Sequence, residues 1–221
     1  MTVILVLATF IAFLTIDYFY SKRVLRPAVQ PMLAPELGRR PQPNIVSGFL
    51  LPETLRYHPG HTWAQSEGPK LVRTGIDDFA ARLIGKVEKI SLPQRGQWVR
   101  QGQKIVTLHR NGVATDLVSP VEGVVTEIND AAAADPERAR RDPYGEGWLV
   151  AVEAPDSKLN FRNLLSGDIA RWWMEEAAAR LRKHLPMAEG AMADGGVAVD
   201  DLSVHLPDQD WGTVTREFFL G

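Results

Sequence analysis

The sequence predicts a mainly β domain of short strands, preceded by one membrane-spanning helix and followed by an amphipathic helix and an acidic tail. Three patterns support this fold class. Residues 3–20 are a nearly unbroken apolar run, residues 55–153 alternate short β-like segments with Gly and Pro turns, and residues 169–185 have helical periodicity. Many short strands with closely spaced turns favour a sandwich or a barrel.

The amino terminus has the pattern of a membrane anchor. As a helix, residues 3–20 would span about 27 Å, close to the thickness of one hydrocarbon core. The aromatic residues 18–20 would lie at the interface, and Lys22 and Arg23 follow directly. The positive-inside rule then predicts a bacterial cytoplasmic-membrane protein with its amino terminus outside and its domain in the cytoplasm. A cleaved signal peptide is the alternative, but the basic start and the small-residue cleavage site are missing.

Residues 21–54 are rich in Pro and basic residues, and Pro at this density prevents a long helix. We expect a juxtamembrane tether that holds the next domain near the bilayer.

The predicted β region contains eight candidate strands. They are residues 62–64, 71–73, 85–90, 98–99, 105–108, 114–118, 123–128 and 147–152. Two helical stretches interrupt them. Residues 76–84 place apolar side chains on one face, with Asp77 and Asp78 at the helix start. Residues 129–141 are rich in Ala, and Pro136 should break or restart that helix.

The segment 169–185 predicts an amphipathic helix with Ser166 or Asp168 as its cap. Its expected apolar stripe is Ile169, Trp172, Trp173, Ala177 and Leu181.

The tail, residues 187–221, is acidic and should be flexible and solvated. It ends in aromatic and apolar residues, namely Trp211, Phe218, Phe219 and Leu220. Two alternatives remain open for them: they dock on a partner protein, or they fold back onto their own domain.

The composition argues against several functions. A net charge of −2 does not favour nucleic-acid binding, and the absence of Cys excludes disulfides and thiolate chemistry. His58 and His61 have a spacing found in metal sites, but no further ligand cluster accompanies them, so we expect no metal. We also find no constellation typical of catalysis. The expectation is therefore no enzymatic activity and no small-molecule substrate.

The turn Arg110-Asn111-Gly112 carries the most information about function. Asn-Gly is the preferred pair for a two-residue type I′ hairpin turn, because both residues tolerate positive φ. The sequence predicts a hairpin at this position, with His109 beside its tip.

Five motifs resemble the glycine cleavage system H protein family over nearly its whole length. They are His61-Thr62-Trp63, Gly75 to Ala80, Leu83-Ile84-Gly85, Ser119 to Gly123 and Asp142 to Leu149. The resemblance implies a barrel-sandwich hybrid of the lipoyl-domain type for residues 55–186, with flanking short helices.

In the family that these motifs resemble, a lysine at the hairpin tip carries lipoate. Counting from Gly102 or back from Ser119 places Gly112 at that position, and no lysine lies between Lys104 and Lys158. Glycine has no side-chain amine, so we expect no cofactor at this site. His109, Arg110 and Asn111 remain as candidate partner contacts.

Together these observations predict a non-catalytic, membrane-tethered accessory or scaffold subunit of a bacterial membrane complex, with respiratory or electron-transfer complexes as the leading candidates. The alternative is a membrane-localised adaptor or regulator that docks soluble lipoate-dependent enzymes. An enzyme, or a carrier with its cofactor elsewhere in the chain, is a third class.

Overall fold

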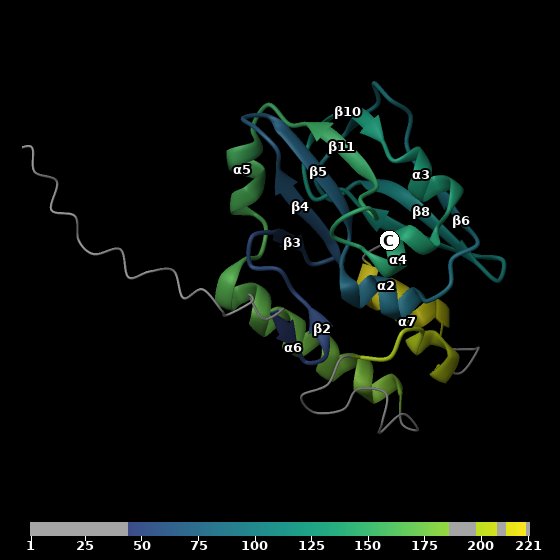
Figure 1. Ribbon diagram of the computed structural model, residues 1–221. Helices are drawn as coiled ribbons and strands as arrows, with labels where there is room; N and C mark the ends of the chain where they lie inside the picture. The colour runs from purple at the N-terminus through teal and green to yellow at the C-terminus, as the bar shows by residue number, and fades with distance from the viewer. Residues whose placement is uncertain (1–43, 186–197, 207–210, 220–221) are drawn as a thin grey trace, which may run out of the picture. The chain divides into compact units, whose positions relative to one another are not determined.

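The computed structural model describes residues 44–185, 198–206 and 211–219, which belong to one compact unit, residues 43–221 (Figure 1). The expected membrane helix and residues 21–43 of the expected tether lie outside the described residues. Among the helices that are described, none is long and apolar enough to cross a bilayer.

The largest sheet has six antiparallel strands in the order β3-β4-β5-β11-β10-β7. Their bounds are β3 Arg56–His58, β4 Thr62–Ser66, β5 Leu71–Ile76, β11 Val150–Glu153, β10 Gly123–Ile128 and β7 Trp98–Val99. This order places β3 at one edge and β7 at the other, a separation that matters for the surface described below.

Two smaller sheets complete the β structure. The three-stranded sheet has the order β6-β8-β9 and contains the predicted hairpin. Its strands are β6 Lys89–Ser91, β8 Lys104–Arg110 and β9 Val113–Val118. The two-stranded sheet pairs β1 Ile45–Val46 with β2 Phe49–Leu50.

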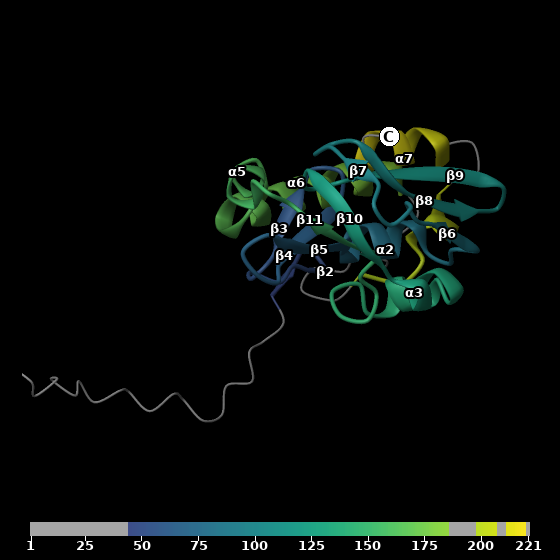
Figure 2. The same ribbon diagram turned by 90° about the horizontal axis from the view of Figure 1, so that it is seen from above.

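Short helices flank the sheets, as expected, and one long helix follows them (Figures 1 and 2). They are α2 Asp78–Ile84, α3 Asp130–Ala134, α4 Glu137–Arg141, α5 Ser157–Arg162, α6 Gly167–His184, the 3-10 turn η1 Leu202–His205 and α7 Trp211–Phe219. The mainly β fold with several helices agrees with the sequence prediction.

Local chemistry explains where the predicted helices begin and end. Asp77 is the N-cap of α2, and its Oδ1 accepts from the Ala80 backbone N–H at 2.8 Å. Asn129 caps α3 in the same way, through the Ala132 N–H. Pro136 separates α3 from α4, as the sequence predicts, because it has no N–H to continue the first helix.

Both larger sheets and the helices contribute buried side chains to one core, which includes the fully buried Trp63. Its indole Nε1 donates to the Pro143 carbonyl at 3.0 Å. A Cβ on Gly75 would fall 2.9 Å from the Trp63 ring, so glycine is needed for this close packing.

Two of the predicted strands are shorter in the structure, because residues 85–88 and 147–149 are not strand. The structure also contains β3, for which the sequence pattern predicts no strand.

The folded unit begins earlier than predicted. Residues 44–54 were assigned to the tether, but β1 and β2 pair there, and Phe49 is fully buried against Phe79 at a ring-centroid distance of 4.9 Å. The Leu50 N–H also donates to Asp78 Oδ2 at 2.8 Å. The Pro-rich composition obscured this hairpin, whose four paired residues are too few to give a strand signal.

The buried face of α6 also differs from the prediction. Trp173, Ala177 and Leu181 are buried as expected, but Ile169 and Trp172 are each 64% exposed. Ala170, Met174 and Ala178 are buried instead. The buried face is rotated relative to the expected stripe, so that Met174 and two alanines are buried while Ile169 and Trp172 face outward.

The tail is not simply solvated. Residues 198–206 and α7 pack on the domain, with Leu202, Val214 and Phe219 fully buried. The acidic composition of residues 187–221 favoured a flexible segment, and its buried apolar residues outweigh that tendency in these two described parts.

Candidate functional site

The tip of the β8–β9 hairpin adopts the predicted two-residue turn. Arg110 pairs with Val113, and the two residues between them have positive φ, 47° at Asn111 and 74° at Gly112. Positive φ at both central positions defines the type I′ turn that suits the twist of the flanking strands. The hairpin of the resemblance is therefore present.

A side chain at position 112 would extend into open solvent. Gly112 is exposed, and a Cβ built on it would meet no heavy atom within 4 Å. A longer side chain would fit here sterically, although its positive φ would strain the backbone of any non-glycine residue. The tip has the geometry to present a side chain but carries none.

Arg110 ties the hairpin to the C-terminal part of the chain. Its side chain is 14% exposed, and its guanidinium bonds both carboxylate oxygens of Asp201, with Nη1···Oδ1 at 3.0 Å and Nη2···Oδ2 at 3.4 Å. The same Nη1 donates to the Ile84 carbonyl at the end of α2. We call this arrangement the Arg110–Asp201 clasp. It holds the tip in place through a side chain two residues from position 112.

The surroundings of Asp201 favour its role as the charged partner of Arg110. Burial alone raises the pKa of its carboxyl, but hydrogen bonds from Ser203 and Arg110 outweigh burial and hold the pKa below its ordinary value. Asp201 also lies directly over Gly85, where an added Cβ would fall 2.1 Å from its Oδ1. No local sequence pattern indicates this contact, because Asp201 is 91 positions from Arg110 in the chain.

The other two candidate residues at the tip are placed differently. His109 lies within β8, half-buried, and its Nε2 is 2.9 Å from Ser91 Oγ on the neighbouring strand β6. Asn111 is exposed, and its backbone N–H donates to Glu88 Oε1 at 3.2 Å. Only Asn111 of this pair presents an open surface.

The aromatic end of the chain is folded into the domain. Phe218 is 1% exposed and Phe219 is 0% exposed, and the Phe218 ring lies 5.1 Å from Phe79. This placement favours the fold-back alternative over partner docking for these two residues. The Trp211 side chain and Leu220 lie outside the described residues.

A buried histidine joins these elements. His61 Nδ1 is 2.8 Å from Asp77 Oδ2, and both side chains are essentially inaccessible to solvent. The His61 ring stacks on Phe79 at 4.1 Å and lies 4.6 Å from Trp173. His61 belongs to the His61-Thr62-Trp63 motif and to the histidine pair with metal-site spacing. The structure places it just before β4, in contact with Asp77 at the start of α2 and with Trp173 on α6. Among the described residues, no group of three or more potential metal ligands occurs.

The segment Asp142 to Leu149 has a clear structural role. Tyr144 Oη donates to the Leu50 carbonyl at 2.7 Å and accepts from the Asp78 N–H at 3.0 Å. Burial raises the pKa of Tyr144 well above its ordinary value, so the hydroxyl stays protonated. Tyr144 of this motif therefore joins β2 to α2.

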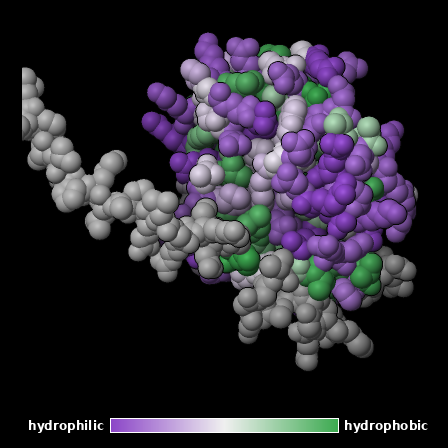
Figure 3. Space-filling model, viewed as in Figure 1, coloured by the Kyte–Doolittle hydropathy of each residue, from purple (hydrophilic) through white to green (hydrophobic). Residues whose placement is uncertain are grey.

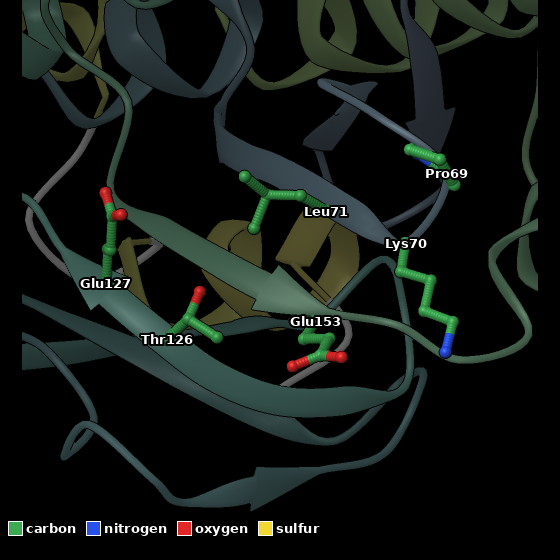
Figure 4. Close-up of a pocket in the computed structure, with 6 residues that line it drawn as sticks. All are labelled: Pro69, Lys70, Leu71, Thr126, Glu127 and Glu153. Atoms are coloured by element: carbon green, nitrogen blue, oxygen red, sulfur yellow. The ribbon is translucent and has the colours of Figure 1, made fainter.

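A surface hollow of about 460 Å³ lies elsewhere, on strands β5, β10 and β11 of the six-stranded sheet (Figure 4). It is lined by Pro69, Lys70, Leu71, Thr126, Glu127 and Glu153. The hollow is in a different sheet from the hairpin tip and shares none of its residues.

Comparison with known proteins finds sequence relatives of this chain. Residues 55–177 match the family model described as Glycine cleavage H-protein. A glycine cleavage system H protein of Rubrobacter xylanophilus is 40% identical over 109 residues, covering 48% of this chain and 86% of the relative. One from Anaeromyxobacter sp. (strain K) is 37% identical over 108 residues, covering 49% of this chain and 84% of the relative.

A crystal structure of a glycine cleavage system H protein from Mycobacterium marinum is 30% identical and covers 48% of this chain and 87% of its own, with a TM-score of 0.44. The family model alone covers more than half of the chain. The chain belongs to the glycine cleavage H-protein family.

Proposed function

We propose that this protein is a non-catalytic, non-lipoylated H-protein-like subunit, tethered to the cytoplasmic face of a bacterial membrane and acting as a scaffold in a membrane complex. The observation that carries the proposal is the hairpin tip. It keeps its type I′ geometry while position 112 is glycine. Lipoate is attached through an amide to an amine, and glycine offers no side-chain nitrogen.

The hairpin itself has no lysine near its tip in place of the missing amine. Lys104 is the only lysine in the hairpin, and it lies at the far end of β8 from the tip. Its Nζ is 2.8 Å from Asp116 Oδ1 on the paired strand. This ion pair and the position of Lys104 at the start of β8 keep its amine away from the hairpin tip.

The clasp supports a static role for the hairpin. Arg110 fixes the tip to Asp201 and to the Ile84 carbonyl, and no side chain at position 112 extends from this fixed turn. A fixed hairpin on a folded domain suits a scaffold, which holds one surface in one geometry.

The membrane attachment rests on residues 3–20, whose length and apolar character suit a spanning helix, and on the basic residues behind them. Respiratory and electron-transfer complexes remain the leading class. Membership of the H-protein family also supports the alternative, an adaptor that docks soluble lipoate-dependent enzymes.

Purification from native membranes separates these two functions. Detergent extraction should release the chain with integral membrane proteins at fixed stoichiometry if it is a subunit of a membrane complex. Recovery with soluble decarboxylase or dehydrogenase proteins, released by salt, would support the adaptor instead. Recovery of the chain in the soluble fraction without detergent would contradict the tether in both versions.

A further inference from the structure

Exposed apolar side chains gather at one end of the domain. Ile169 and Trp172 are each 64% exposed, Leu159 is 58% exposed and Ile45 is 38% exposed. Ile169 and Trp172 lie three residues apart on α6 and are therefore neighbours on its surface. α5, which carries Leu159, lies beside the start of α6, and β1, which carries Ile45, packs against α6 (Figures 1 and 2). We call these four residues the α6 face.

The burial of the neighbouring residues Trp173 and Met174 determines the exposure of Trp172. Its neighbour Trp173 is buried, with ring centroids 6.3 Å from Tyr57 and 4.6 Å from His61. Met174 is fully buried as well. Successive residues on a helix point about 100° apart. With Trp173 fixed in the core, Trp172 is held outward.

The chain enters the domain at the same end. Asn44 is the first described residue, and its Oδ1 accepts from Arg171, which lies between Ile169 and Trp172 in the sequence, at 3.3 Å. The preceding 43 residues, with the apolar run 3–20, are therefore joined to the domain beside the α6 face. A tether anchored in a bilayer keeps the domain close to that bilayer and so raises the effective concentration of the lipid surface. A weak contact of the α6 face with the lipid is then enough for binding.

The charges around the α6 face balance. The stretch that carries this face, residues 157–176, has three exposed cations, Lys158, Arg162 and Arg171, and three exposed anions, Asp168, Glu175 and Glu176. The exposed cations Arg182 and Lys183 lie in the last turn of α6, beyond the face. Such a face gains little from anionic headgroups, whereas an indole ring with an aliphatic neighbour suits the interfacial zone of any bilayer. By contrast, the surface over α3, α4 and β8 in Figure 3 is mainly hydrophilic.

We propose that the α6 face rests on the lipid–water interface, with Trp172 and Ile169 inserted at headgroup depth. The proposal rests on the membrane tether of the proposed function and adds a defined orientation: the edge at β3 faces the bilayer, and the opposite edge at β7 faces away. The hairpin and the clasp are then presented by a domain in one fixed orientation rather than a freely tumbling one.

The test uses the full chain reconstituted in vesicles of phosphatidylcholine with bromine atoms near the headgroup end of the acyl chains. Bromine quenches tryptophan fluorescence on contact. Trp172→Phe should abolish most of the quenching seen in the unaltered chain. The matched control is Trp98→Phe, because Trp98 is 48% exposed on the opposite edge strand β7. The Trp98→Phe substitution should leave the quenching unchanged. High salt should also leave the quenching of the unaltered chain unchanged.

Vesicle flotation is measured in parallel, and thermal midpoints check that both variants are folded. If the chain floats but Trp172→Phe does not reduce quenching, the orientation is wrong while the tether stands. Quenching that depends on Trp98 would place the opposite edge on the lipid and refute the proposal equally. A chain that does not float would overturn both the tether and the orientation. Quenching that disappears in high salt would also contradict the proposal, because it would mean an electrostatic contact.

Discussion

Asp201→Asn should loosen the C-terminal part of the chain from the hairpin. The substitution keeps the size of the side chain but removes the charge that Arg110 bonds with two nitrogens. Arg110 keeps its bond to the Ile84 carbonyl, so the hairpin itself should stay folded. The effect should therefore be a local loss of stability rather than unfolding of the domain.

The magnitude follows from the exposure of the pair. Arg110 is 14% exposed and Asp201 is 30% exposed, so the clasp is partly shielded from water. A hydrogen bond to a charged group contributes about 1.5–3 kcal/mol, and solvent screening reduces this, so we expect a loss of about 1–2 kcal/mol. For a domain of this size the thermal midpoint should fall by about 2–8 °C.

The assay is thermal or urea unfolding of Asp201→Asn, Arg110→Ala and the double variant, which together give the coupling energy of the pair. Asp200→Asn is the matched control. Asp200 also pairs with an arginine, Arg82, at 2.8 Å, but it is 74% exposed, so its loss should cost less than about 0.5 kcal/mol. Equal effects at positions 200 and 201, or additive effects of the two clasp substitutions, would refute the reasoning.

The clasp should also depend on pH. The folded pKa of Asp201 lies below its ordinary value, so its contribution is fully present above the unfolded pKa, near 3.8. That contribution is lost as the pH falls through the folded pKa. The stability difference between the unaltered chain and Asp201→Asn should therefore be constant from neutral pH to about pH 5 and should shrink below about pH 4. A difference that grows on acidification would contradict the assignment.

Three further substitutions test the remaining contacts. Phe218→Ala should cost about 3–5 kcal/mol in unfolding free energy, since the ring is buried against Phe79; an unchanged midpoint with loss of co-purifying partners would instead mean docking on a partner. Asp77→Ala should cost about 2–4 kcal/mol, because it removes the N-cap of α2 and the partner of His61; a loss below 1 kcal/mol by urea unfolding would contradict that role. Gly112→Lys should cost about 1 kcal/mol from its positive φ and give a folded domain. Incubation with a lipoate ligase then shows whether the restored lysine is modified, and unfolding of this variant would contradict the open geometry of the tip.

The sequence predicted the β domain well where local signals are strong. The Asn-Gly turn, the break at Pro136 and the cap at Asp77 each follow from the conformational demands of one or two residues. The strands of the two larger sheets are bounded by Gly and Pro, which made most of them visible without any knowledge of their pairing.

The contacts that define the candidate site depend on long-range packing and could not be predicted in this way. Asp201 meets Arg110 across 91 positions of sequence, and nothing local distinguishes it from the exposed Asp200 beside it. The outward position of Trp172 depends on which face of α6 meets Tyr57. Two adjacent tryptophans give no local indication of which one is buried.

The central claim is that this H-protein-like domain does not carry lipoate, and intact-mass measurement of the protein purified from its own host membranes tests it most directly. A lysine amide of lipoate would add a fixed mass increment, and peptide mapping would locate it. We predict the unmodified mass, with the peptide spanning Arg110 to Gly112 unaltered. A lipoyl increment on any lysine of the chain would contradict the account.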